Sequence, residues 1–171
     1  MRNLEFKARV SDPKALQSRV RALGADPWGD LRQTDTYFAV ERGRLKLRET
    51  AGYQAEFVYY ERAEDDATRP SDYELARSPD PEALRSMLTR ALGVLAVVRK
   101  RRTLLLLDTT RIHLDNVDGL GDFLELEVPV RDDEAAAAAR IDALIRDLGY
   151  AWTDCIRASY LDLITAKETS A

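Results

Sequence analysis

The sequence predicts an α+β protein built on an eight-stranded antiparallel β-barrel, closed or nearly closed, with helices packed outside it. Many short strand-like segments are joined by tight turns, and on several of them charged residues alternate with apolar ones. Because side chains two positions apart in a strand point to the same face, each such strand has one apolar and one charged face. The apolar faces must meet a core or a helix, which leaves the charged faces for solvent or for a shared interior.

Eight segments have the composition and alternation of strands. They lie at about 2–10, 34–40, 44–50, 53–62, 71–77, 95–107, 110–116 and 122–130. Arg42-Gly43 and Ala51-Gly52 predict tight turns between antiparallel neighbours. A longer turn is expected around Gly119, before the last strand. Strands that are mostly joined by hairpins suit a small antiparallel barrel.

Three helices are predicted, each with apolar residues spaced three and four positions apart and hence one buried face. They lie at about 12–23, 80–92 and 132–147. The first two open with an Asp-Pro pair and close at a glycine, which is the expected punctuation of a helix. The repeat of a helix followed by strands predicts two pseudo-equivalent halves within one domain, residues 1–165. The polar segment 64–72 is expected to be a mobile loop, and residues 166–171 a frayed tail.

Composition excludes several classes of protein. The chain has 171 residues, of which 45% are hydrophobic and 33% charged, and a net charge of -4, so one domain with a real core is expected and general nucleic-acid binding is disfavoured. The basic run 99–102 lies in a leucine- and valine-rich stretch and is interpreted as strand. The single cysteine, Cys155, excludes a disulfide framework and a cysteine-rich metal site. No apolar run reaches the ~18–20 residues of a membrane span and no signal-peptide core is present, so a cytoplasmic protein is expected.

The charged strand faces carry both acids and bases. Four acids offer hard oxygen donors that suit Mg²⁺ or Mn²⁺, namely Glu5, Asp115, Glu125 and Glu127. Seven bases suit phosphoryl oxygens, namely Lys7, Lys46, Arg48, Arg62, Lys100, Arg102 and Arg111. The simplest alternative is a sheet with one wet face. It is disfavoured because five strands share the pattern and like charges are stacked at i and i+2, so the pattern predicts a site for a polyanion and its metal ions.

The only histidine, His113, shares the strand face of Arg111 and Asp115. Two interpretations stay open for it: a hydrogen-bonded structural residue, or a proton shuttle or metal ligand. The sequence contains no glycine-rich phosphate loop, no nucleophile elbow and no Cys/His zinc pattern. P-loop, α/β-hydrolase and zinc-hydrolase functions are therefore not expected.

Seven segments, in order along the chain, resemble the CYTH superfamily of triphosphate tunnel metalloenzymes. They are Asn3-Leu4-Glu5-Phe6-Lys7, Asp35-Thr36-Tyr37-Phe38, Leu45-Lys46-Leu47-Arg48, the segment 56–62, the segment 98–102, Arg111-Ile112-His113-Leu114-Asp115 and the segment 119–127. The last segment, with its Gly-x-Gly turn before Phe-Leu-Glu-Leu-Glu, looks closest to the class IV adenylyl cyclase branch. The chain departs from the family's N-terminal E-x-E-x-K signature at its first acid, where it has Asn3.

The resemblance implies an eight-stranded tunnel whose bases hold a triphosphate and whose acids hold Mg²⁺ or Mn²⁺. The same acids and bases are then the metal ligands and phosphate-binding residues, with Lys7 and Arg111 as the candidate catalytic cations. The implied reaction is conversion of ATP to cyclic AMP and pyrophosphate. The alternatives are an organic or inorganic triphosphatase similar to thiamine triphosphatase, or, because of Asn3, a non-catalytic or specialised binder of phosphate ligands. The expected partner is a nucleoside triphosphate or other polyphosphate, with neither nucleic acid nor membrane. An open barrel edge would favour a homodimer.

Overall fold

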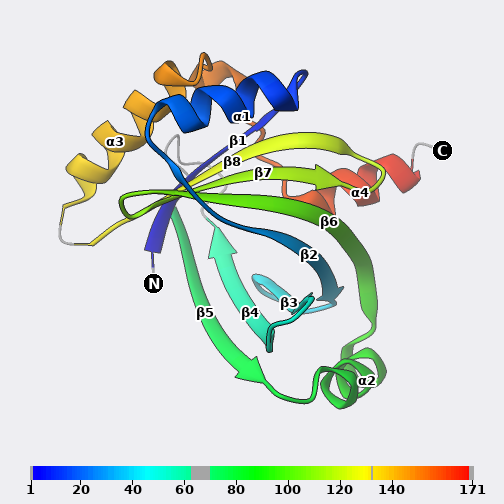
Figure 1. Cartoon of the computed structure of the whole chain (residues 1–171). Helices are drawn as coiled ribbons and strands as arrows, with labels where there is room; N and C mark the ends of the chain where they lie inside the picture. Colours follow the sequence, from blue (N-terminus) through cyan, green and yellow to red (C-terminus); the bar gives the residue numbers. More distant parts are fainter. Residues whose placement is uncertain (1, 63–69, 132, 170–171) are drawn as a thin grey trace.

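The computed structural model describes residues 2–62, 70–131 and 133–169, and it confirms the predicted barrel. Eight antiparallel strands close in the order β1-β5-β4-β3-β2-β6-β7-β8 (Figure 1). Their bounds are β1 Arg2–Arg9, β2 Asp26–Phe38, β3 Arg44–Thr50, β4 Ala55–Arg62, β5 Pro70–Ser78, β6 Val94–Leu107, β7 Thr110–Val117 and β8 Gly121–Pro129. A long ladder joins β1 to β8 and a short one joins β1 to β5, so that the ring is complete.

Closure of the barrel gives the alternating strands two buried faces. In β1 every residue in the range Asn3–Ala8 is buried, although every second one is polar or charged. The outward side chains Leu4 and Phe6 pack under the helices α1 (Pro13–Ala22) and α3 (Glu134–Asp147), which lie side by side over β1 and β8 (Figure 1). The remaining face of the strand is directed into the barrel.

Two further helices cover other parts of the barrel. The helix α2 (Pro81–Leu92) lies apart from the other helices in Figure 1 and packs Leu84 and Leu88 against a small cluster around Phe38. The helix α4 (Tyr160–Thr169) follows a short 3₁₀ turn and packs its first residues beside β6. None of the helices in the described ranges has the length and apolar character needed to cross a membrane.

The three predicted helices are present and capped by aspartate. The side chains of Asp12, Asp80 and Asp133 each accept a hydrogen bond of 3.0 Å from the backbone N–H three residues further on. Such caps satisfy backbone donors that the first turn of a helix leaves unpaired.

The structure differs from the sequence prediction in three places. β2 begins at Asp26, eight residues before the expected start at 34, because a bulge between Pro27 and Gly29 carries the ladder past residues that usually end a strand. The helix α4 is absent from the sequence prediction, and it extends to Thr169, within the segment expected to be frayed. Most of the predicted mobile loop 64–72 lies outside the described residues, and β5 begins at its end.

Candidate active site

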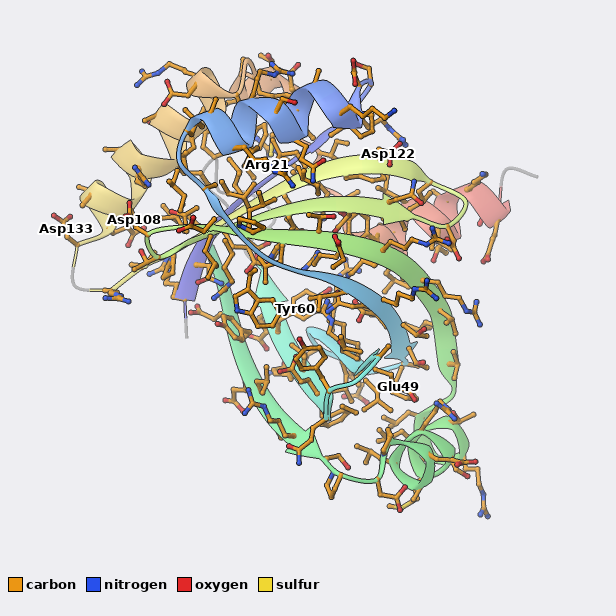
Figure 2. The ribbon with its side chains drawn as sticks, viewed as in Figure 1. Arg21, Glu49, Tyr60, Asp108, Asp122 and Asp133 are labelled. Atoms are coloured by element: carbon orange, nitrogen blue, oxygen red, sulfur yellow. The ribbon has the colours of Figure 1, made fainter. Side chains whose placement is uncertain are left out.

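The interior of the barrel contains a cavity of about 350 Å³, and all eight strands contribute to its wall. The lining residues are Asn3, Glu5, Lys7, Leu31, Gln33, Tyr37, Lys46, Arg48, Glu56, Val58, Tyr60, Tyr73, Leu75, Lys100, Arg102, Leu104, Arg111, His113, Glu125, Glu127, Ser159 and Tyr160. Figure 2 shows side chains of facing strands meeting inside the ring, with Tyr60 of β4 among them. The charged strand faces therefore enclose a shared interior.

The structure brings most of the predicted site residues to this cavity. The bases that line it are Lys7, Lys46, Arg48, Lys100, Arg102 and Arg111, and the acids are Glu5, Glu125 and Glu127. Arg62 belongs to β4, but its side chain lies outside the part of the chain that the structure describes. Asp115 is buried, with 2% of its surface exposed, and faces the neighbouring arginine.

The basic run of β6 is divided between the two faces of the strand. Lys100 and Arg102 are buried inside the barrel, whereas Arg99 and Arg101 are exposed on its outer surface. The interpretation of this run as strand is therefore confirmed. Only every second of its charges can act in the cavity.

Three cations of the cavity share one carboxylate, that of Asp35 on β2. The Nζ atoms of Lys46 and Lys100 donate to its Oδ2 at 3.0 and 3.2 Å. Arg48 donates from Nε to Oδ1 at 2.7 Å and from Nη2 to Oδ2 at 2.8 Å. Only 1% of the surface of Asp35 is exposed. One negative charge thus faces three positive charges in a buried place, which suits an incoming polyanion.

This imbalance alters the proton affinity of the cluster. Burial, and then repulsion by Arg48, lowers the pKa of Lys46 to about 7. Burial lowers the pKa of Lys100 to about 8, with repulsion from Arg102 and Arg48 in the same direction. Attraction to Asp35 opposes both changes, but one carboxylate is divided among three cations. Burial would raise the pKa of Asp35, yet those three cations hold it well below its usual range.

On the wall formed by β6, β7, β8 and β1, cations and carboxylates are matched. Arg102 donates from Nε and Nη2 to the two oxygens of Asp115 at 2.7 and 2.6 Å, and Nη2 also reaches Glu125 Oε2 at 2.8 Å. Lys7 Nζ lies 3.2 Å from Glu125 Oε1 and 4.3 Å from the ring centre of Tyr160. The Tyr160 hydroxyl donates to Asp115 Oδ2 at 2.9 Å. Asp115 is thereby held by Arg102 and Tyr160, beside the cavity and not facing into it.

Asn3, the departure from the family signature, is part of a chain with Arg111 and Glu127. Arg111 donates from Nε to Glu127 Oε2 at 2.7 Å, and its Nη2 donates to the amide oxygen of Asn3 at 2.9 Å. The amide nitrogen of Asn3 donates to the carbonyl oxygen of Arg2 at 3.2 Å, which fixes the orientation of the amide. Burial opposes ionisation of Glu127, but neighbouring His113 and Arg111 lower its pKa to about 2. Glu127 is therefore ionised at neutral pH.

The cavity also contains a group of donors that fits a divalent metal ion. Three ligand atoms lie within 4.8 Å of one another, one each from His113, Glu125 and Glu127. Two carboxylates and an imidazole are a common donor set for divalent cations. Glu5 lies opposite Glu127 in the β1–β8 ladder and lines the same cavity. Among the described residues, Asp115 and Glu5 are not members of this close group.

Asn3→Glu should raise the affinity for Mn²⁺. A carboxylate at this position attracts Arg111 away from Glu127. The Oε2 atom of Glu127, which now accepts from Arg111, then becomes available to bind the metal ion. We expect roughly tenfold tighter binding, which is about 1.4 kcal/mol and close to one charge-assisted hydrogen bond. Titration of free Mn²⁺ by electron paramagnetic resonance measures it. Asn3→Gln, of the same length as glutamate but uncharged, is the control, and equal affinities in the two variants would contradict the role given to Asn3.

Sequence reasoning assigned no role to Asp35 or to several residues that line the cavity, among them Tyr160. Gln33, Asp35 and Tyr37 nevertheless follow the same alternation as the predicted strand faces. That spacing could have placed all three inside the barrel. Tyr160 carried no such signal, because it enters the cavity from a helix that was not predicted.

Known proteins resemble this chain in sequence and in fold. The CYTH domain profile matches residues 1–160. A protein of Methanocaldococcus jannaschii, described as a candidate adenylate cyclase, is 26% identical over 95% of this chain and 98% of its own.

Solved structures share the fold over nearly the whole chain. A protein of Pyrococcus horikoshii has a TM-score of 0.86 at 26% identity, covering 94% of this chain and 98% of its own. A plant protein of Hippeastrum has a TM-score of 0.70 at 15% identity, covering 96% of each chain, a likeness of fold alone.

Proposed function

Because the chain belongs to the CYTH domain family, we propose that its barrel binds a triphosphate together with a divalent metal ion and converts it enzymatically. The first assignment is the reaction of a class IV adenylyl cyclase, ATP to cyclic AMP and pyrophosphate. One observation carries the proposal: a charged cavity inside a closed barrel, in which two buried lysines and the partly buried Arg48 share the single carboxylate of Asp35. The likeness to the candidate adenylate cyclase of Methanocaldococcus jannaschii supports the choice of reaction.

Binding would use cations that the fold already holds in place. Lys46, Arg48 and Lys100 are positioned by Asp35, so a phosphate group meets donors that need little reorganisation. Each charge-assisted bond to a phosphoryl oxygen contributes roughly 1.5–3 kcal/mol. The triphosphate would also relieve the repulsion among these three cations. For both reasons its charged chain is assigned to this side of the cavity.

The reaction would occur where this basic side meets the acidic wall. In cyclisation, the ribose 3′ oxygen loses its proton and bonds to the α-phosphorus, while the bond to the bridging oxygen breaks and the leaving pyrophosphate takes up the proton. Lys7 and Arg111, beside Glu125 and Glu127, are proposed to stabilise the charge that develops on the phosphoryl oxygens. A divalent metal held by Glu125 and Glu127 supplies Lewis acidity. Glu5 lies at the same wall and is proposed as a further ligand.

Hydrolysis of a triphosphate is the second candidate. It is favoured by one finding, namely that the Hippeastrum protein of the same fold is described as a candidate adenylyl cyclase with a dominant triphosphatase activity. The same cation arrangement can serve either reaction, because only the nucleophile changes from a ribose hydroxyl to water.

Product analysis tests the proposal and separates the two reactions. The purified protein is incubated with ATP and, separately, with tripolyphosphate, each with Mn²⁺ and with Mg²⁺. Cyclic AMP with pyrophosphate supports the cyclase, and orthophosphate release supports the triphosphatase. No turnover in any condition, despite thermal stabilisation by tripolyphosphate, would replace the enzyme by a binding protein.

Neighbouring residues of β6 provide a matched pair for the binding step. Lys100→Met removes a buried cation of the Asp35 cluster, and we expect triphosphate affinity to fall at least about tenfold, the value of one lost charge-assisted bond. Arg99→Met removes an exposed cation one position away and should leave affinity unchanged. Calorimetric titration with tripolyphosphate measures both. Equal losses in the two variants would mean that binding is general electrostatic attraction outside the barrel.

Triphosphate affinity should fall as the pH rises through the pKa values of Lys46, about 7, and Lys100, about 8. Both lysines must be protonated to attract phosphate, so affinity is greatest below this range and is lost above it. Each lysine contributes a limiting slope of about tenfold per pH unit.

Calorimetry at constant ionic strength between about pH 7 and about pH 9 measures this dependence. Lys46→Arg keeps its charge throughout the range and should flatten the curve. An affinity of the natural protein that does not change with pH would contradict the assigned roles of the two lysines.

A further inference from the structure

The imidazole of His113 lies in the metal-binding corner of the cavity with one nitrogen unaccounted for. It projects from β7 into the barrel and only 3% of its surface is exposed. Its Nδ1 atom is buried and, among the described residues, has no hydrogen-bond partner. Leaving a buried polar atom unpaired costs about 1–3 kcal/mol. Such an atom in a natural protein calls for a physical reason, and a ligand is one.

The position of Nδ1 identifies the kind of ligand. It lies 3.5 Å from Glu125 Oε2 and 3.7 Å from Glu127 Oε1. These separations exceed the usual length of a hydrogen bond between the groups. They are somewhat longer than the ~3 Å between adjacent donors of an octahedral ion with bonds of ~2.1 Å, so a bound ion would draw the donors together. One ligand atom from each of the three residues lies within 4.8 Å of the others, so a single cation placed among them would contact all three.

An ordinary structural histidine does not account for this geometry. A neutral imidazole that only stabilises the fold would use Nδ1 to donate to, or accept from, a neighbour at about 2.9 Å. Neither neighbouring carboxylate depends on a positive charge on His113 for a partner, because Glu125 is paired with Lys7 and Arg102, and Glu127 with Arg111.

We infer that His113 Nδ1 is a metal ligand, which makes the site a mixed nitrogen–oxygen one that prefers Mn²⁺ or a later transition-metal ion to Mg²⁺. The inference rests on the proposed function for the presence of a metal and adds the ligand and the preference. Imidazole suits transition metals, whereas Mg²⁺ binds oxygen donors and retains its waters. Glu125, Glu127 and His113 then occupy three positions and leave the others for phosphoryl oxygens and water.

Pulsed electron paramagnetic resonance of bound Mn²⁺ tests the inference on the unaltered protein. Tag-free protein is prepared with natural and with ¹⁵N-labelled histidine and given one equivalent of Mn²⁺, with and without tripolyphosphate. His113 is the only histidine of the chain, so any histidine nitrogen coupled to Mn²⁺ is its own. We expect a nitrogen coupling that changes on labelling.

The possible failures are distinguishable. Bound Mn²⁺ whose couplings do not respond to labelling would overturn the histidine ligand and leave the proposed function intact. Absence of Mn²⁺ binding, with or without tripolyphosphate, would overturn both.

A variant tests the metal preference independently. His113→Gln should weaken Mn²⁺ binding at least about tenfold, since even indirect partners of metal ligands are worth that much. Mg²⁺ affinity should change less, and Asn116→Ala, on the exposed side of β7, should change neither. A variant that loses both ions equally would overturn the preference.

Discussion

We expect the double variant Glu125→Gln, Glu127→Gln to lose metal-dependent turnover by at least about a hundredfold, because Lewis-acid stabilisation of this kind is worth several kcal/mol. The two carboxylates contribute two of the three close donors to the metal group, and glutamine is a weaker, uncharged ligand. Product formation from ATP and from tripolyphosphate with Mn²⁺ measures the loss.

Binding should change in the opposite direction. Glu125 and Glu127 now neutralise Lys7, Arg102 and Arg111, so their removal leaves the cavity more positive by two charges. We therefore expect metal-free tripolyphosphate to bind the double variant at least as tightly as the natural protein. The ligand-free variant should melt at a lower temperature, and tripolyphosphate should restore much of the difference.

Asp122→Asn is the matched control for this experiment. Asp122 belongs to the same strand but lies outside the cavity, where it accepts a hydrogen bond from Asn116. The Asp122→Asn variant should preserve both turnover and tripolyphosphate binding. A double variant that retains Mn²⁺-dependent turnover would remove Glu125 and Glu127 from the reaction altogether.

The sequence allowed the barrel and most of its interior to be predicted, because both depend on local alternation. A strand with charges at every second position has only two faces, and the apolar one must be covered. Lys100 and Arg102 could therefore be assigned to the same side without knowledge of the strand order. The helix caps at Asp12 and Asp80 are equally local signals.

Other features depend on contacts between distant segments. That Asp35 is the common partner of Lys46, Arg48 and Lys100 follows from β2 lying between β3 and β6, which alternation alone does not determine. The helix α4 buries only its first two residues, Tyr160 and Leu161, so it lacks the periodic apolar stripe by which helices are recognised. Asp115 and Glu125 looked equivalent in the sequence, yet the structure shows Arg102 and Tyr160 holding Asp115.

Asp35→Asn should be the most destabilising single substitution in the cavity. Removal of one partner from a buried ion pair costs about 3–5 kcal/mol, and here three cations lose the same partner. The melting temperature should fall by about 10 °C or more in a chain of this size. At a pH at which both lysines stay protonated, triphosphate affinity should rise, because the cations no longer have a competing carboxylate. Thermal melting and calorimetric titration with tripolyphosphate measure the two effects, and refolding with tripolyphosphate present recovers a variant that does not fold alone.

The opposite signs of these effects distinguish an anion site from a purely structural ion cluster. If the cluster only stabilised the fold, Asp35→Asn would lower stability and leave anion affinity unchanged or weakened.

The dependence of stability on acid gives a second comparison. In the folded protein the three cations hold the pKa of Asp35 well below its usual range. The stabilisation by Asp35 is therefore fully present above the unfolded pKa of about 3.9, and it is lost as the pH falls through the lower pKa of the folded protein. The stability difference between the natural protein and Asp35→Asn should thus narrow below about pH 4. Asp26→Asn, exposed on the same strand, should show neither effect. A lower melting temperature without tighter anion binding would confine Asp35 to a role in folding and move the triphosphate away from Lys46, Arg48 and Lys100.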